Sequence, residues 1–300
     1  MKPVAASSPR PRATVGVATA TALTIAGVYA PPASAITQGV ATNAFQAVGR
    51  GVQVAPDWVL TVQHAALSPS QFYVNGFGKR TVAQRYDAPG SAFPANDLAL
   101  LRLAAAPTAA GFLEVADSGL GDADFAPVPV TIVSSGNVPG GSAARAYGTT
   151  TVQRSRVLID PDDSGPLPPV TANYLISVDD IVHVQSGDSG GGLFAGHVQD
   201  SGVLVGMSSA LFTPIPEGFT GSGFVQPGAY RAWIDAVMQA DTADTEMLRW
   251  VSNPVPEPAT WALWAGGLAA LALALRRRTV RSPAGGRRRQ AADPYFTEQP

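Results

Sequence analysis

The sequence has no cysteine, only three histidines and few charged residues, and each scarcity excludes a class of chemistry. A chain without cysteine has no thiol nucleophile, disulfide or thiolate metal site. Having only three histidines, His64, His183 and His197, weakens the case for a multi-histidine metal centre. We therefore expect no metal and no other cofactor. Hydrophobic residues make up 46% of the chain, which is enough for a packed core.

Charge is unevenly distributed along the chain. Residues 36–258 contain ten Lys and Arg but twenty Asp and Glu, and so carry a net charge near −10. An acidic surface repels phosphates, so we expect no nucleic-acid partner. The acidic pairs Asp162–Asp163 and Asp179–Asp180 lack the alternating oxygen ligands of a calcium loop and are interpreted as solvated loops.

The first 35 residues have the order of a secretory signal peptide. Lys2, Arg10 and Arg12 precede an apolar run at 15–30, and "ASA" ends at Ala35. Removal of this segment by signal peptidase would make Ile36 the first residue. The alternative, a short core helix, fits poorly with so many Pro, Ser and Arg residues before it.

The other end has the features of a membrane anchor. Residues 241–254 are expected to be a linker, and "PEP" at 256–258 precedes an uncharged helix at 259–275 and three arginines at 276–278. At about 1.5 Å per residue, such a helix just reaches across a hydrocarbon core of roughly 30 Å if the flanking tryptophans and arginines snorkel. Residues 255–278 resemble the PEP-CTERM sorting signal of Gram-negative bacteria, which implies processing by an exosortase and a place in the cell envelope, at the surface or in the extracellular matrix. The basic tail at 279–300 is longer than such signals usually have.

Between these signals the sequence is β-rich. Apolar runs of five to eight residues, such as "DLALLRLA" and "GVLVGMSSALF", are separated by Gly and Pro, which predicts an all-β barrel or sandwich. One late helix is expected, because the apolar residues of "AYRAWIDAVMQ" recur at helical spacing.

The stretch "QSGDSGGGLF" places Ser189 among glycines. A serine hydroxyl attacks a carbonyl only when a base takes its proton and a third group orients that base. His64 follows an apolar strand in "WVLTVQHAA", and Asp97 opens another in "NDLALLRL". Taken singly, His64 fits a structural histidine and Asp97 a turn former.

In the order His, Asp, Ser, these three motifs resemble those of the trypsin-like, chymotrypsin-fold serine peptidases. The resemblance covers residues 36–240 and implies two packed six-stranded antiparallel β-barrels, about 36–120 and 121–240, with the boundary near 117–127, and a closing helix. It implies an endopeptidase with Ser189 as nucleophile, His64 as general base and then acid, and Asp97 as its orienting carboxylate, acting on a protein or peptide substrate. The backbone N–H groups of Gly187 and Ser189 would form the oxyanion hole.

The sequence departs from the family at two positions and leaves other functions open. Ala65 follows His64 where the family usually has cysteine, and Gly192 stands in place of a common proline. Neither change removes a catalytic group. The alternatives are a non-catalytic binding or scaffold module on the same fold and a structural component of the extracellular matrix.

The resemblance also suggests how the site is activated and what it binds. A new N-terminus at Ile36 would pair with Asp188, although only 28 residues separate Ile36 from His64. The specificity pocket would have its base near His183, which either accepts an acidic or polar side chain or lies away from the pocket. One wall would comprise Ser209, Ala210 and Leu211. His197 is interpreted as a solvated turn residue.

Overall fold

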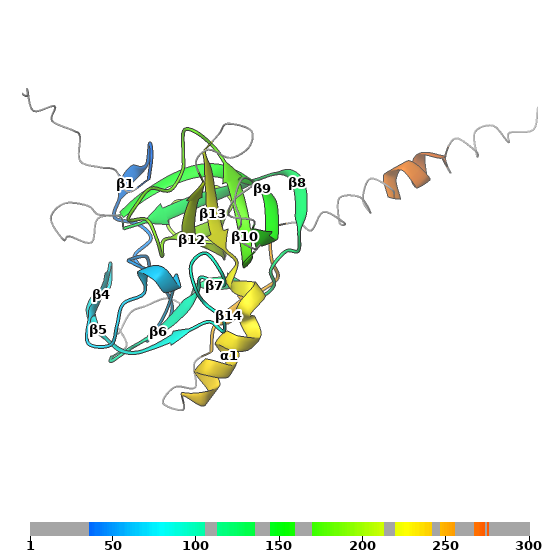
Figure 1. Ribbon diagram of the computed structural model, residues 1–300. Coiled ribbons are helices and arrows are strands. Elements are labelled where there is room, and N and C mark those ends of the chain that lie inside the picture. The colour runs from blue at the N-terminus through cyan, green and yellow to red at the C-terminus, as the bar shows by residue number, and fades with distance from the viewer. Residues whose placement is uncertain are drawn as a thin grey trace, which may run out of the picture. The chain divides into compact units, whose positions relative to one another are not determined.

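A computed structural model describes residues 36–105, 113–135, 145–159, 170–212, 220–241, 247–255, 267–273 and 275. It confirms a mainly β architecture of two barrel-like sheets with a helix near the end of the domain (Figure 1). The predicted signal peptide, most of the predicted membrane helix, the tail and the pair Asp162–Asp163 lie outside the described residues.

The smaller sheet is antiparallel and has five strands in the order β2-β3-β6-β5-β4. Its strands are β2 (Val52–Ala55), β3 (Trp58–Thr61), β4 (Phe72–Asn75), β5 (Gly78–Asp87) and β6 (Ala99–Leu103). Every residue of β2 and β3 is buried, as expected for strands covered on both faces. Thr61, the last residue of β3, pairs with Ala99, the first of β6. This register brings the residues after β3 next to those before β6.

The larger sheet has nine strands, eight of them in the order β11-β8-β9-β10-β13-β12-β7-β14, with β1 on β9. They are β1 (Val40–Thr42), β7 (Glu114–Ala116), β8 (Ala123–Ser134), β9 (Arg145–Ile159), β10 (Val170–Val178), β11 (Gly192–Ala195), β12 (Leu204–Phe212), β13 (Gly221–Val225) and β14 (Arg249–Val251). Strand β11 also pairs with β12, which closes this part of the sheet on itself. Such closure removes exposed strand edges.

The strand count and the division between the barrels differ from the sequence prediction. Within the described residues the two sheets have five and nine strands rather than six each. Strands β1 and β7 come from the range assigned to the first barrel, but β1 pairs with β9 and β7 pairs with β12 and β14. The chain therefore contributes to the second sheet both before and after it builds the first.

A single buried cluster joins the two sheets. Val52 and Leu60 of the smaller sheet belong to the same cluster as Phe194 and Met207 of the larger sheet. Burial of a large aliphatic or aromatic side chain contributes about 1.5–3 kcal/mol, so shared packing of this kind resists separation of the sheets. The loops that meet between the sheets are held at a fixed distance as a result.

The predicted helix is present as α1 (Arg231–Ala240), preceded by the 3₁₀ helix η2 (Pro227–Tyr230). Ile234 and Met238, four residues apart, are its buried residues and pack into the core that joins the sheets. This one-sided burial is what the helical spacing in the sequence predicted.

The segment predicted as a linker, 241–254, is partly folded onto the domain. Strand β14 lies in it and pairs in parallel with β7. The Trp250 indole donates to Asp235 Oδ1 over 2.8 Å, and Leu248 and Val255 are buried. These contacts give the segment a hydrophobic anchor and backbone partners that a polar linker would lack, so the ordered domain continues to Val255.

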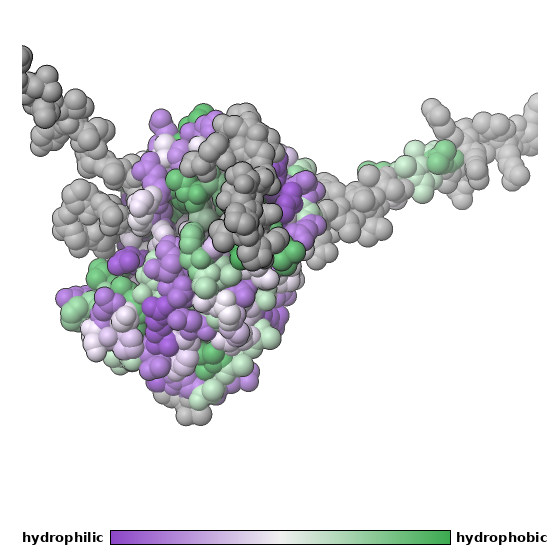
Figure 2. Space-filling view, viewed as in Figure 1, coloured by the Kyte–Doolittle hydropathy of each residue, from purple (hydrophilic) through white to green (hydrophobic). Residues whose placement is uncertain are grey.

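The surface seen in Figure 2 carries both hydrophilic and hydrophobic residues. Hydrophilic residues cover much of this face, and hydrophobic ones are scattered among them. Scattered apolar residues are normal for a protein surface and do not by themselves indicate a docking face.

Candidate active site

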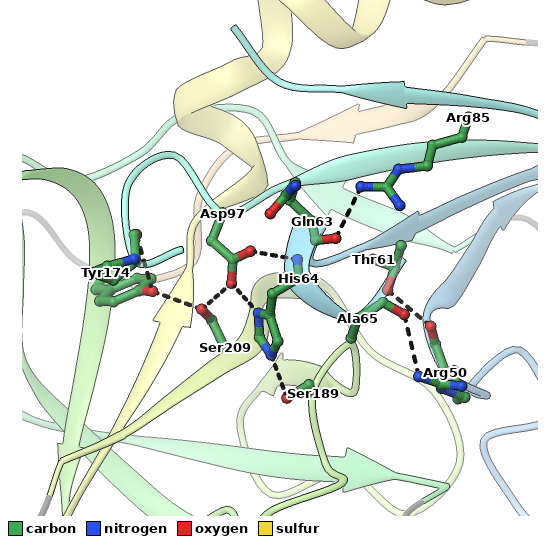
Figure 3. A network of polar contacts seen from close by, with 11 residues as sticks. Arg50, Thr61, Gln63, His64, Ala65, Arg85, Asp97, Tyr174, Ser189 and Ser209 are labelled. Carbon is green, nitrogen blue, oxygen red and sulfur yellow. Dashed lines mark hydrogen bonds and ion pairs between the residues drawn. The ribbon is translucent and has the colours of Figure 1, made fainter. Parts of the chain in front are cut away.

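The three side chains that the motifs singled out meet between the two sheets (Figure 3). His64 lies on the 3₁₀ turn η1 (Gln63–Ala65) after β3, Asp97 lies just before β6, and Ser189 lies in the turn before β11. His64 Nδ1 is 2.8 Å from Asp97 Oδ2, and His64 Nε2 is 2.8 Å from Ser189 Oγ. The three form one continuous hydrogen-bonded chain from carboxylate to hydroxyl.

Asp97 orients the imidazole at two points. Its side chain is fully buried, and Oδ1 accepts the backbone N–H of His64 over 3.0 Å while Oδ2 accepts from the ring. An ionised carboxylate can only accept, so Nδ1 of His64 carries the proton and Nε2 is left to accept from Ser189. This is the tautomer that a general base for serine requires.

A second pair of residues supports the carboxylate from the larger sheet. Ser209 on β12 donates to Asp97 Oδ2 over 2.5 Å, and the Tyr174 hydroxyl on β10 is 2.6 Å from Ser209 Oγ. Burial raises the pKa of Tyr174 above its ordinary value, so the phenol stays protonated. The sequence placed Ser209 in a pocket wall and carried no signal for this contact or for Tyr174.

Phe93 is another residue that sequence reasoning missed. Its ring lies edge-on to the His64 ring with 4.7 Å between centroids, and its side chain is 51% exposed. Aromatic edge contacts of this kind prefer a fixed relative orientation. Phe93 therefore gives the imidazole a second contact besides the hydrogen bonds to Asp97 and Ser189.

The glycines around Ser189 have two different uses. Asp188 N donates to Gln185 O over 3.0 Å, and the third residue of this turn, Gly187, has φ of +102°. A positive φ at that position is characteristic of a type II turn, whose central peptide is flipped relative to type I. Only glycine adopts this φ without strain, so Gly187 sets the direction of its own N–H. Within the described residues, the N–H groups of Gly187 and Ser189 have no hydrogen-bond partner.

Gly190 serves instead to let two segments of the chain approach each other closely. A Cβ added there would lie 2.6 Å from Thr61 Oγ1 and 2.9 Å from the carbonyl oxygen of Arg50. Gly190 N also donates to the carbonyl oxygen of Ser208 on β12. The loop that carries Ser189 is thus pressed against the smaller sheet, which carries His64, while it remains hydrogen-bonded to the larger one.

Asp188, beside Ser189, is a buried carboxyl group with incomplete hydrogen bonding. It is 1% exposed, and burial raises its pKa to about 7, although hydrogen bonds from Gln185 and Ser134 oppose the effect. Its Oδ1 atom has no hydrogen-bond partner within the part of the chain described. Ile36 is fully buried nearby, in a β-bridge to Val184, the residue before Gln185.

A cavity of about 150 Å³ opens beside Ser189. Its lining comprises Val184, Gln185, Ser186, Ser189, Ser208, Ser209, Ala210 and Leu211. The wall expected at Ser209 to Leu211 is at this cavity, and none of these lining residues is charged.

His183 is not in the lining, which corrects its placement at the base of the pocket. Its Nε2 atom lies 2.9 Å from Thr37 Oγ1 and its Nδ1 atom 3.2 Å from the carbonyl oxygen of Asp179. Thr37 N also donates to the carbonyl oxygen of His183. The segment after Ile36 therefore holds this ring, which agrees with the alternative interpretation that His183 lies away from the pocket.

The remaining titratable candidates have structural partners. Asp179 accepts the backbone N–H groups of Ile181 and Val182, and Asp180 accepts that of Thr220. These bonds use the carboxylates to cap turns. His197 lies exposed in a bend. Among the described residues, no group of three or more His, Asp or Glu side chains could hold a metal ion.

The sequence itself matches two family models. Residues 32–234 match the model described as trypsin. The chain belongs to the trypsin family. Residues 254–278 match the PEP-CTERM protein-sorting motif, which shows the sorting signal indicated by "PEP" and the arginines. This motif implies export and sorting to the surface of a Gram-negative bacterium.

Solved structures resemble this trypsin-family chain at low identity. Neuropsin, a serine protease expressed in the limbic system of mouse brain, is 18% identical with a TM-score of 0.45. The scabies mite inactivated protease paralogue S-I1 is 19% identical with a TM-score of 0.47. Each match covers 63% of this chain and 87% of the other. No curated protein matches the sequence.

The predicted membrane anchor lies largely outside the described residues. Residues 267–273 are helical, and no helix in the described ranges is both long and apolar enough to span a bilayer.

Proposed function

We propose that this trypsin-family chain is an exported serine endopeptidase. The observation that carries the proposal is the unbroken hydrogen-bonded chain Ser189–His64–Asp97, in which a buried carboxylate fixes the tautomer of the base. A serine hydroxyl positioned in this way loses its proton to Nε2 as Oγ attacks a carbonyl carbon. Asp97 then stabilises the imidazolium without taking its proton.

The intermediate formed by this attack carries a negative oxygen. The Gly187 and Ser189 N–H groups, which have no other partner among the described residues, are the donors we assign to it. One such donor lowers the barrier by about 3 kcal/mol. His64 next gives its proton to the leaving amine, which leaves an acyl-enzyme on Ser189. Water, deprotonated by His64, hydrolyses the ester and restores the serine.

A fluorophosphonate probe tests the proposed chemistry. The wild-type chain cleaved after Ala35 should become covalently labelled, and Ser189→Ala should abolish the labelling, because the probe reacts with an activated serine. Absence of labelling in properly processed protein would contradict the peptidase and favour a binding or scaffold module at the surface.

Two processing enzymes are the proposed partners of this chain, and one of their cleavages would activate the site. Signal peptidase would release Ile36, and an exosortase would act at the PEP-CTERM motif. The free amine of Ile36 would then pair with Asp188. Two observations support this pairing: Ile36 is buried beside Val184, and Asp188 is buried with one oxygen lacking a partner among the described residues. A buried carboxylate normally has a cation or several donors.

The cavity beside Ser189 favours a substrate whose residue on the amino side of the cleaved bond has an uncharged side chain. Its described lining offers hydroxyls and apolar groups but no counter-ion for a charged residue. Burying an unpaired charge is costly. A cavity of about 150 Å³ holds a benzene-sized group, so the side chain should be no larger than Leu or Phe.

A library of fluorogenic peptides tests this specificity. Cleavage should be fastest after uncharged residues such as Ala, Val or Leu, and Leu211→Gly should extend it toward larger ones, because Leu211 forms part of the wall. A strict preference after Arg, Lys, Asp or Glu would contradict the assignment.

A further inference from the structure

The turn that carries His64 is too short to hold itself in place. It is a single 3₁₀ turn, Gln63–Ala65, with no side-chain cap at its start. Its own hydrogen bonds run only from Ala65 N to Val62 O and from Ala66 N to Gln63 O, each over 3.2 Å. So short a helix has poor hydrogen-bond geometry. This cysteine-free chain cannot fix the turn with a disulfide either. The precise position of the general base therefore depends on other contacts.

Arg85 on β5 supplies two of these contacts. Its Nη2 atom donates to the carbonyl oxygen of Gln63 over 3.1 Å, and its Nη1 atom donates to that of Ala66 over 3.2 Å (Figure 3 shows the first). The two carbonyls lie on either side of His64 and Ala65 in the sequence. One planar guanidinium thus spans the whole turn, which a lysine ammonium could not do with the same geometry.

Asp87 orients this guanidinium. Its Oδ1 atom accepts from Arg85 Nε over 2.7 Å and its Oδ2 atom from Nη2 over 3.0 Å. The two side chains are only 22% and 40% exposed, so they are less hydrated than a free surface pair. An exposed ion pair alone contributes about 0–1 kcal/mol, so the pair itself does not explain the arrangement. Its effect lies in aiming two donors at the turn.

Arg50 reaches the same turn from another side. Its Nη2 atom lies 3.5 Å from the carbonyl oxygen of Ala65, and its own carbonyl oxygen accepts the Thr61 hydroxyl over 2.8 Å. Arg50 therefore makes one long contact to the turn, whereas Arg85 makes two shorter ones. Arg85 is the stronger candidate for control of the turn.

We propose that Arg85, aimed by Asp87, is a positioning residue for His64. Asp97 holds the N–H and the ring nitrogen of His64, and Arg85 holds the carbonyls before and after it. Fixing the turn at both ends keeps Nε2 at hydrogen-bonding distance from Ser189 Oγ. The proposal rests on the proposed peptidase function, because it concerns the base of that reaction.

Kinetics of fluorophosphonate labelling in the chain cleaved after Ala35 test the role in catalysis. Arg85→Met removes the donors but keeps the length of the side chain, and the labelling rate at saturating probe should fall about 10- to 100-fold, as for a misplaced catalytic group. Arg85→Lys should recover only part of the rate, since it keeps the charge but loses the fork. An unchanged half-saturating concentration of probe would separate positioning from binding.

Arg156→Met is the matched control. Arg156 also pairs with a carboxylate, Asp124, and donates to a carbonyl, that of Ala123. It lies on β9 opposite Tyr174, but none of its hydrogen bonds among the described residues reaches His64, Asp97 or Ser189. Its labelling rate should stay close to wild type, within about twofold for a surface substitution of this kind. If Arg85→Met also labels at the wild-type rate, Arg85 does not position the base.

A second measurement separates failure of this proposal from failure of the peptidase function. With only three histidines, ¹⁵N-histidine labelling gives three ring systems that can be assigned from His183→Gln and His197→Gln. The Nδ1–H signal of His64, bonded to Asp97, should shift or broaden in Arg85→Met and not in Arg156→Met. An unchanged signal would overturn the positioning role even if wild-type protein never labels, whereas a shift without labelling would overturn only the peptidase.

Discussion

Release of Ile36 as a free N-terminus should change how the stability of the domain depends on pH. The group responsible is Asp188, which is buried and has one oxygen without a partner among the described residues. The perturbation is a comparison of two chains that differ by one residue. One begins at Ile36, and the other has a single alanine before Ile36, which moves the amine by about 3.3–3.6 Å.

The sign and size of the effect follow from the pKa of Asp188. With Ile36 joined to the residues before it, burial holds this pKa at about 7, against an ordinary value of 3.8. We expect the chain with the extra alanine to keep the raised value, because its amine is displaced from the position of the Ile36 nitrogen. Between these values the unfolded chain has lost the proton and the folded chain keeps it, so stability falls as pH rises. At about 1.36 kcal/mol per unit the loss is about 4 kcal/mol, complete near pH 7.

The chain that begins at Ile36 should behave differently. An adjacent ammonium favours the ionised carboxylate and lowers the pKa of Asp188, so the loss between pH 4 and pH 7 should shrink or disappear. The amine has an ordinary pKa of about 7.7, which pairing raises. Its contribution is therefore fully present below pH 7.7 and is lost as pH rises through the higher folded value.

Urea unfolding between pH 4 and pH 9 measures both curves. Asp188→Asn in each chain is the control, because the difference from its parent isolates this carboxyl from all others that titrate. In the chain with the extra alanine, the asparagine variant should gain stability relative to its parent as pH rises. Parallel difference curves for the two chains would refute the pairing, and full labelling activity with the extra alanine would refute its role in activation.

Two further substitutions test the packing and the hydrogen bonds of the site. Gly190→Ala should destabilise the fold by about 1–3 kcal/mol and reduce labelling of Ser189, because its Cβ would clash with Thr61. Gly196→Ala is the control for backbone strain, since Gly196 also has a positive φ but a Cβ there would meet nothing within 4 Å. Equal losses of stability for the two variants in thermal unfolding would contradict the clash. Ser209→Ala should cost about 1.5–3 kcal/mol by removing a hydrogen bond to the Asp97 carboxylate, and should lower kcat about tenfold or more. Ser177→Ala is the control, because it removes a neutral hydroxyl 3.1 Å from Thr150 and should leave kcat unchanged. Similar kcat values for both variants would count against support of Asp97 by Ser209.

Local patterns were enough for much of the fold. Apolar runs separated by turn residues predicted β-structure, and the spacing of Ile234 and Met238 predicted α1. Both patterns are local, because the spacing of buried residues depends on neighbouring positions in the sequence. Within the described residues the strand count of each sheet differs from the prediction, since pairing of β1, β7 and β14 depends on partners far along the chain. The segment around Trp250 was mistaken for a linker for the same reason.

The sequence by itself determined the candidate catalytic groups of this protein: a serine among glycines, a histidine after one strand and an aspartate before another. Their identity follows from residue type and local context, and the register of Thr61 with Ala99 then places His64 beside Asp97. Only the tertiary structure decided what surrounds them. Ser209 and Arg85 reach the site across long sequence separations, and the ring of His183 bonds to Thr37 instead of facing the pocket. Side-chain direction depends on contacts between distant segments, which no local pattern records.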